Sequence, residues 1–228
     1  NGDRKFEAQI RKASSIRKKS GLTDAILFLE GLKAQYKSNL LKVNILLGEI
    51  GLYNEEKKYT KIINLVNDSI IENPNNLQLI YARAMAYESL KKISLMEEDL
   101  KYILSIEATS ANTLNALGYS LTIHTNRYTE AEKYIRKALE FDPGNAAILD
   151  SLGWVLYKKG DIKNALYYIE LAYNKDQNPE IVEHFCEILI KNGFYQKSKK
   201  VMELEVRKNP NNADLLNNLT TLHSDDSL

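Results

Sequence analysis

The sequence has 228 residues, of which 44% are hydrophobic and 27% charged, a balance that excludes an intrinsically disordered chain. Its formal net charge of +1 excludes a bulk electrostatic attraction to nucleic acid or to a membrane surface. Cys186 is the only cysteine, so no intrachain disulfide can form, and no apolar run approaches the length of a membrane span.

The first half of the chain predicts helical pairs that lack a strong signature. An apolar stripe at helical spacing, flanked by lysines and arginines, runs through residues 4–19: Phe6, Ile10, Ala13 and Ile16. Ser20-Gly21 breaks this helix, and a partner helix follows with Ala25, Ile26, Leu29 and Leu32. The next pair is expected at residues 40–53 and 59–72, with a turn at residues 54–56.

From Leu77 onward a regular repeat is evident. In the segment that follows Pro143, Leu149, Leu152, Gly153 and Leu156 share one helix face, and Ala165, Ile169 and Ala172 form a second stripe after a break at residues 159–161. Gly118 occupies the same position one repeat earlier, 35 residues before Gly153, and we expect the extra residue in the turn at residues 124–127. Arg83 stands at a normally apolar position of the preceding repeat.

These helix–turn–helix units of about 34 residues, with small residues where two helices cross, resemble the tetratricopeptide repeat (TPR). The resemblance implies an all-α superhelical solenoid of about six repeats plus a C-terminal capping helix. We expect one solenoid over residues 1–223, with the capping helix at residues 213–222, and a short acidic tail at residues 224–228.

The order of several blocks resembles a narrower group, the bacterial outer-membrane TPR lipoproteins. The blocks are YARAMAYESLKKISLMEEDL, LNALGYSL, AILDSLGWVLYKKGD and PEIVEHFCEILIKNG. This resemblance implies a scaffold facing the periplasm that acts as an adaptor for a carboxyl-terminal processing protease and its cell-wall hydrolase substrates. Phe185-Cys186 departs from the Leu-Gly usual there, and the sequence lacks the lipid-bearing N-terminal cysteine. Because the chain opens with Asn1-Gly2-Asp3, we expect it to be trimmed from a longer protein.

No motif in the sequence indicates catalysis, a cofactor or a metal site. A phosphate-binding glycine loop, a paired-histidine zinc motif and a nucleophile elbow are all missing. We predict that His124 is a solvated turn residue, His184 a helix-surface residue and His223 a tail residue. Cys186 is expected to be a small buried hydrophobe rather than a reactive thiol. Together with the missing motifs, these expectations predict that the chain is not an enzyme.

The TPR resemblance places a partner-binding groove on the first helix of each repeat. It implies that the following side chains point into this groove: Tyr81, Met85, Asn115, Tyr119, Asp150, Trp154, Tyr157, Lys158, Glu183 and Glu187. Trp154, the only tryptophan, is predicted to be the centre of this surface, and the alternative is that it packs on the next repeat. Asp150, Glu183 and Glu187 would make this part of the groove acidic and would favour a partner with lysine or arginine.

Three functions remain open at this point. The first is a non-catalytic protein-binding scaffold at the periplasmic face of the outer membrane, held there by a lipid anchor outside this sequence. The second is a cytoplasmic TPR adaptor with an unrelated client. The third is the helical regulatory part of a larger enzyme. None of the three requires nucleic acid.

Overall fold

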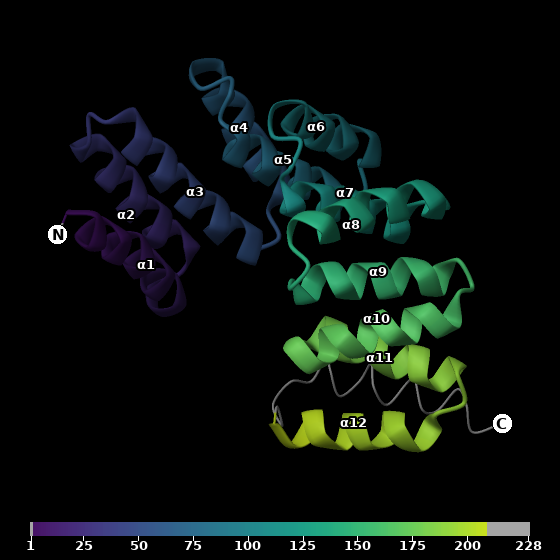
Figure 1. The fold of residues 1–228 in the computed structure, drawn as a ribbon. Helices are drawn as coiled ribbons and strands as arrows, with labels where there is room; N and C mark the ends of the chain where they lie inside the picture. Colours follow the sequence, from purple (N-terminus) through teal and green to yellow (C-terminus); the bar gives the residue numbers. More distant parts are fainter. Residues whose placement is uncertain (1, 209–228) are drawn as a thin grey trace. The chain divides into compact units, whose positions relative to one another are not determined.

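The structure, a computed structural model, describes residues 2–208 and consists there of helices joined by short turns (Figure 1). The helices are α1 (Gly2–Ser20), α2 (Leu22–Gln35), α3 (Asn39–Glu55), α4 (Tyr59–Glu72), α5 (Leu77–Ser89), α6 (Ile93–Ile106), α7 (Ala111–His124), α8 (Tyr128–Phe141), α9 (Ala146–Lys158), α10 (Ile162–Lys175), α11 (Pro179–Lys191) and α12 (Tyr195–Lys208). The odd-numbered helices are the first helices of the predicted repeats, and the even-numbered ones are the second helices.

The chain divides into two compact units near the end of α6, at Ile103 and Leu104. The first unit has two clusters of buried residues, one around Leu29 and Ile45 and one around Ile62 and Leu79. In the second unit each first helix packs on the second helix that follows it, and α9 to α12 form a ladder of successive antiparallel helices (Figure 1). The prediction of a single solenoid over residues 1–223 stays a prediction.

Two glycines of the second unit let paired helices approach closely, as the sequence predicts. A Cβ atom added at Gly153 on α9 would lie 3.0 Å from the backbone nitrogen of Ile169 and 3.2 Å from the carbonyl oxygen of Ala165. At Gly118 on α7 an added Cβ would lie 2.8 Å from the carbonyl oxygen of Ala131. Only a residue without a side chain fits these crossings, because backbone atoms of the partner helix fill the space.

A tight turn ends four of the first helices. Its central residue has a positive φ: 54° at Lys57 after α3, 56° at Lys91 after α5, 83° at Gly160 after α9 and 76° at Gly193 after α11. In each turn the next backbone N–H donates to a carbonyl of the preceding helix, as Asp161 does to Leu156 at 2.9 Å. These hydrogen bonds satisfy carbonyls that the end of a helix leaves without a partner.

Charged side chains lie at or near the core of the first unit. Arg83 on α5, which the sequence places at an apolar position, donates to both carboxylate oxygens of Asp99 on α6 at 2.9 and 2.7 Å and to Asn67 at 2.7 Å. Glu49 on α3 is 4% exposed, and its Oε1 has no hydrogen-bond partner in the described part of the chain. Burial raises the pKa of Glu49 to about 7, although Lys33 counteracts the shift.

The predicted helices agree with the structure in number and order over residues 2–208. The extra residue before Gly153 lies within the predicted residues 124–127, but at the end of a helix and not in the turn: α7 ends at His124 and has 14 residues, whereas α5, α9 and α11 each have 13. The expected capping helix at residues 213–222, His223 and the acidic tail lie outside the described residues.

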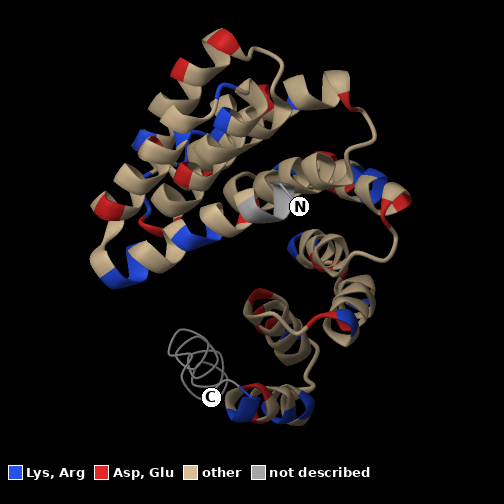
Figure 2. Ribbon diagram, turned by 90° about the vertical axis from the view of Figure 1, so that its left-hand side faces the viewer, with Lys and Arg blue, Asp and Glu red and all other residues tan. Residues whose placement is uncertain are grey.

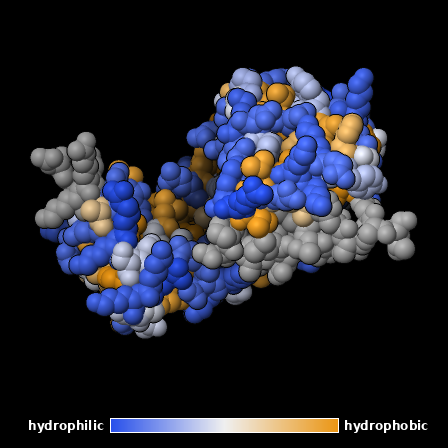
Figure 3. Space-filling view, turned by 90° about the horizontal axis from the view of Figure 1, so that it is seen from below, coloured by the Kyte–Doolittle hydropathy of each residue, from blue (hydrophilic) through white to orange (hydrophobic). Residues whose placement is uncertain are grey.

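The surface of both units mixes charges of opposite sign. Both Lys and Arg residues and Asp and Glu residues are scattered along the helices of each unit (Figure 2). Exposed hydrophobic residues form separate patches between them (Figure 3). Among the helices of residues 2–208, none combines the length and the hydrophobicity that crossing a membrane requires.

Candidate functional site

Aromatic side chains from three successive first helices meet in the second unit. Tyr119 comes from α7, Trp154 and Tyr157 from α9, and His184 from α11, and we call these four residues the aromatic cluster. The rings of Trp154 and His184 stack with centroids 3.8 Å apart and an interplanar angle of 15°. The Tyr157 ring lies 5.2 Å from Trp154, and the Tyr119 ring lies 6.4 Å from His184. First helices of three successive repeats therefore contribute to one aromatic cluster, in which Trp154 and His184 are buried and the two tyrosines are half-buried.

His184 is buried, so its prediction as a helix-surface residue was wrong. Its Nδ1 lies 2.9 Å from Oδ1 of Asp150 on α9, and both side chains are buried. Burial raises the pKa of the Asp150 carboxyl, and the hydrogen bond with His184 opposes this shift. Asp150 therefore holds the imidazole in place. The sequence predicted that Asp150 would present an acidic side chain to a groove, but the carboxyl is buried.

Trp154 is enclosed on both faces. It is 6% exposed, and packing on the next repeat, the alternative considered from the sequence, describes its contact with His184. Lys158, one turn further along α9, places its Nζ 4.2 Å from the Trp154 ring centroid and 5.4 Å from the Tyr157 ring centroid. Because the stacked imidazole fills one face of the indole, the ammonium group lies over the other face.

Glutamates on α11 interact with the two tyrosines. The Tyr119 hydroxyl donates to Oε1 of Glu180, a contact that runs from α7 past α9 to the first turn of α11. The Tyr157 hydroxyl interacts with the Glu187 carboxylate; burial, together with this carboxylate, raises the pKa of the phenol. Phenols are neutral at pH 7, so these contacts orient the two carboxylates without neutralising their charge.

Two polar atoms of this region are buried without a hydrogen bond to any described residue. They are the indole Nε1 of Trp154 and the amide Oδ1 of Asn115, which lies on α7 one helical turn before Tyr119. One is a hydrogen-bond donor and the other is an acceptor. Such orphaned atoms are uncommon in folded proteins and call for a physical account.

The structure brings together only part of the predicted groove. Asn115, Tyr119, Asp150, Trp154, Tyr157, Lys158 and Glu187 lie in or beside the aromatic cluster, and Glu183 lies between Glu180 and Glu187 on α11. Tyr81 and Met85 are half-buried on α5 of the other unit. Sequence reasoning missed Glu180 and the role of His184. The contact of His184 with Asp150 could have been found from spacing, because His184 follows Asp150 by 34 residues, which is one repeat length.

The described residues offer no candidate metal site, and the cysteine considered from the sequence is buried. They contain no group of three or more histidine, cysteine or acidic side chains able to hold a metal ion. Cys186 is fully buried, as predicted, and burial raises the pKa of its thiol to about 12, which keeps it protonated and unreactive. His124 is the last residue of α7 rather than a turn residue.

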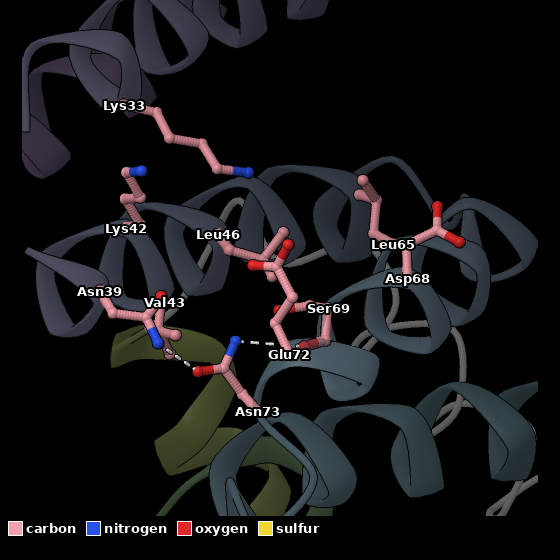
Figure 4. A pocket seen from close by; sticks show the side chains of 10 residues that line it. All are labelled: Lys33, Asn39, Lys42, Val43, Leu46, Leu65, Asp68, Ser69, Glu72 and Asn73. Carbon is pink, nitrogen blue, oxygen red and sulfur yellow. Dashed lines mark hydrogen bonds between the residues drawn. The ribbon is translucent and has the colours of Figure 1, made fainter. Parts of the chain in front are cut away.

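The first unit carries a hollow between α2, α3 and α4, with a volume of about 290 Å³ (Figure 4). Two of its polar side chains are hydrogen-bonded: the Asn39 amide donates to Asn73 at 2.6 Å, and the Asn73 amide donates to the backbone carbonyl of Ser69 at 3.1 Å. Lysines and acids both line it, so it favours neither sign of charge. The aromatic cluster is therefore the stronger candidate.

No protein-family model matches the chain. A TPR repeat-containing protein of Pseudomonas aeruginosa is 29% identical over 180 residues, which are 79% of this chain and 30% of that protein. A TPR repeat-containing protein of Methanocaldococcus jannaschii is 31% identical over 101 residues, which are 43% of this chain and 18% of that protein. The chain thus spans less than a third of the length of either relative.

Solved structures show the same fold at low sequence identity. A TPR protein of Thermus thermophilus has a TM-score of 0.64 at 17% identity, covering 77% of this chain and 91% of its own. A TPR protein of Parabacteroides merdae has a TM-score of 0.67 at 15% identity, covering 89% and 79%. MamA of Desulfovibrio magneticus has a TM-score of 0.59 at 15% identity, covering 75% and 94%. The chain folds as a TPR solenoid.

Proposed function

We propose that this TPR solenoid is a non-catalytic scaffold that binds a partner protein at the aromatic cluster and the adjoining glutamates of α11. The observation that carries the proposal is the convergence of α7, α9 and α11 on one surface, which the contact between Tyr119 and Glu180 spans. Tyrosine and tryptophan provide large contact areas with little conformational entropy to lose, and they often dominate binding energies.

We also propose the setting of this scaffold. Its support is the resemblance of the blocks between Tyr81 and Gly193 to outer-membrane TPR lipoproteins of bacteria. By this resemblance the protein would work at the periplasmic face of the outer membrane, attached through a lipid anchor outside this sequence. Its partner would be a carboxyl-terminal processing protease, together with the cell-wall hydrolases that the protease degrades.

The test is affinity capture from a native envelope fraction, with mass spectrometry of the bound proteins. Wild-type protein is compared with Tyr157→Ala and with a matched tyrosine change, Tyr167→Ala, on the exposed side of α10. We expect wild type and Tyr167→Ala to retain the same partner and Tyr157→Ala to retain less of it. Trp154 is not the first choice for this test, because its ring is buried and its removal would disturb the contact with His184.

Titration of the captured partner then measures the effect. Tyr157→Ala should weaken binding by about 1–2 kcal/mol, the range of a strong interface tyrosine. All variants are first checked for an unchanged melting temperature. Equal affinity of wild type and Tyr157→Ala would contradict the proposed surface and direct attention to the first unit.

A further inference from the structure

Lys158 closes the one face of Trp154 that the repeat stack leaves open. His184, fixed by Asp150, covers the opposite face. Of the two groups that enclose the indole, the imidazole is buried and the lysine is exposed. The inner wall is therefore rigid, whereas the outer wall is a flexible side chain in water.

The contact that Lys158 makes is typical of ligand recognition. Its ammonium lies within 6 Å of two aromatic ring centroids, at 4.2 Å from Trp154 and 5.4 Å from Tyr157. The two rings lie 5.2 Å apart at an interplanar angle of 32° and form two walls of a cation site. A site of this kind accepts a lysine or arginine side chain from another molecule as readily as its own.

The surroundings of the site favour a positively charged occupant. Glu180 and Glu187 lie on α11, and each interacts with a neutral tyrosine hydroxyl of the aromatic cluster. Their negative charge complements a basic segment and would speed its association. Lys158 is the cation that now lies over the cluster itself.

An orphaned donor at the same place points independently to a missing ligand. The Nε1 of Trp154 is buried and makes no hydrogen bond within the described chain. A carbonyl oxygen of a bound segment that reached this nitrogen would supply the missing hydrogen-bond partner. Gaining that hydrogen bond would offset the penalty of a buried donor without a partner.

We propose that Lys158 is a built-in occupant of a cation site formed by Trp154 and Tyr157, and that a lysine or arginine side chain of the partner protein replaces it on binding. This inference rests on the proposed function and adds to it the chemistry of the partner: an exposed basic segment. Lys158 thus lowers the affinity for a weakly basic segment, since every ligand must first displace it.

The experiment measures binding of a fluorescently labelled Gly-Lys-Gly-Lys-Gly-Lys peptide by anisotropy. Wild type is compared with Lys158→Ala and with Lys163→Ala, which removes the same charge from an exposed position on α10. We expect Lys158→Ala to bind about two- to fivefold more tightly than Lys163→Ala, the factor that corresponds to an exposed cation–π contact. A Gly-Glu peptide of equal length should bind neither variant more tightly than the lysine peptide.

A second readout follows the displacement itself. In the free protein the ring currents of Trp154 shift the side-chain proton resonances of Lys158, and saturating lysine peptide should return them toward their free values. Equal tightening by the two lysine variants, or unchanged Lys158 resonances at saturation, would overturn the proposal.

The partner found by affinity capture separates this inference from the proposed function. If Tyr157→Ala weakens capture but Lys158→Ala does not strengthen it, the surface binds its partner and the cation site is wrong. If neither change alters capture, both proposals are wrong.

Discussion

The two units close the same turn with different residues. After α3 and α5 the residue with positive φ is a lysine, Lys57 or Lys91, whereas after α9 and α11 it is Gly160 or Gly193. A side chain in the left-handed region costs about 1–2 kcal/mol, so lysine would not choose this conformation in isolation. The packing of the paired helices imposes the turn, and in the second unit the local sequence agrees with it.

The cores of the two units also differ, and again the second unit follows the repeat pattern more closely. The second unit places Gly118 and Gly153 where its helices cross, and its buried acid Asp150 is paired with His184. The first unit buries Asp99, which pairs with the half-buried Arg83, and the unpaired Glu49 oxygen. The same repeat architecture therefore tolerates lysines with positive φ and charged groups in its core when neighbouring contacts compensate for them.

Asp99→Ala should destabilise the first unit by about 3–5 kcal/mol. The change removes the carboxylate that pairs with the Arg83 guanidinium, and the Arg83 side chain is only 17% exposed, so water replaces that partner poorly. The matched change in the second unit is Glu130→Ala, which breaks the exposed pair of Arg127 and Glu130. That pair should contribute less than about 1 kcal/mol. Urea unfolding followed by circular dichroism measures both, and similar losses would contradict the comparison.

Glu49→Gln should remove a pH dependence of stability that is specific to the first unit. Because burial raises the pKa of Glu49 from 4.5 to about 7, the folded state retains a proton there that the unfolded chain loses above pH 4.5. The free energy of unfolding of wild type should therefore fall as the pH rises from 4.5 to about 7, by on the order of 3 kcal/mol.

Urea unfolding at pH 5 and pH 8 checks this sign for Glu49. The glutamine variant should be more stable than wild type at pH 8 and similar to it at pH 5. Glu30→Gln is the comparison variant: Glu30 is exposed on α2, and its charge is the smaller of the two causes that raise the Glu49 pKa, so most of the pH dependence should remain. A pH slope that survives in Glu49→Gln would assign it to another group.

Alanine should have opposite effects at two helical glycines. At Gly153 an added Cβ meets backbone atoms of α10 at 3.0 and 3.2 Å, and overpacking there should cost about 1–3 kcal/mol. At Gly51 on α3 an added Cβ meets nothing within 4 Å, and alanine should stabilise the helix by about 0.5–1 kcal/mol. Thermal unfolding of both variants is sufficient, because the prediction concerns the sign.

The smallest effect is expected in the turns. Lys91→Gly should stabilise the first unit by up to about 1 kcal/mol, because glycine adopts positive φ without strain. Gly160→Lys should destabilise the second unit by a similar amount. If both changes are neutral, the turns do not distinguish the two units.

Much of the fold could be predicted because helix periodicity and small crossing residues follow directly from sequence. The pattern around Gly153 predicts both α9 and α10 with their close contact, and the structure agrees. The aromatic cluster was only partly predictable. Tyr119, Trp154 and Tyr157 stood at groove positions, but the burial of His184 depends on how α11 packs against α9. The period of a single helix does not encode that contact, and only the 34-residue spacing between Asp150 and His184 points to it.

The position of the only tryptophan has a spectroscopic consequence. Trp154 lies in the second unit, where a stacked imidazole and an ammonium group shield it from water. Its fluorescence should therefore be blue-shifted and should report the opening of the second unit alone, whereas circular dichroism reports helix loss in both. Following the two signals through one denaturation would show whether the units unfold in a single step or one after the other.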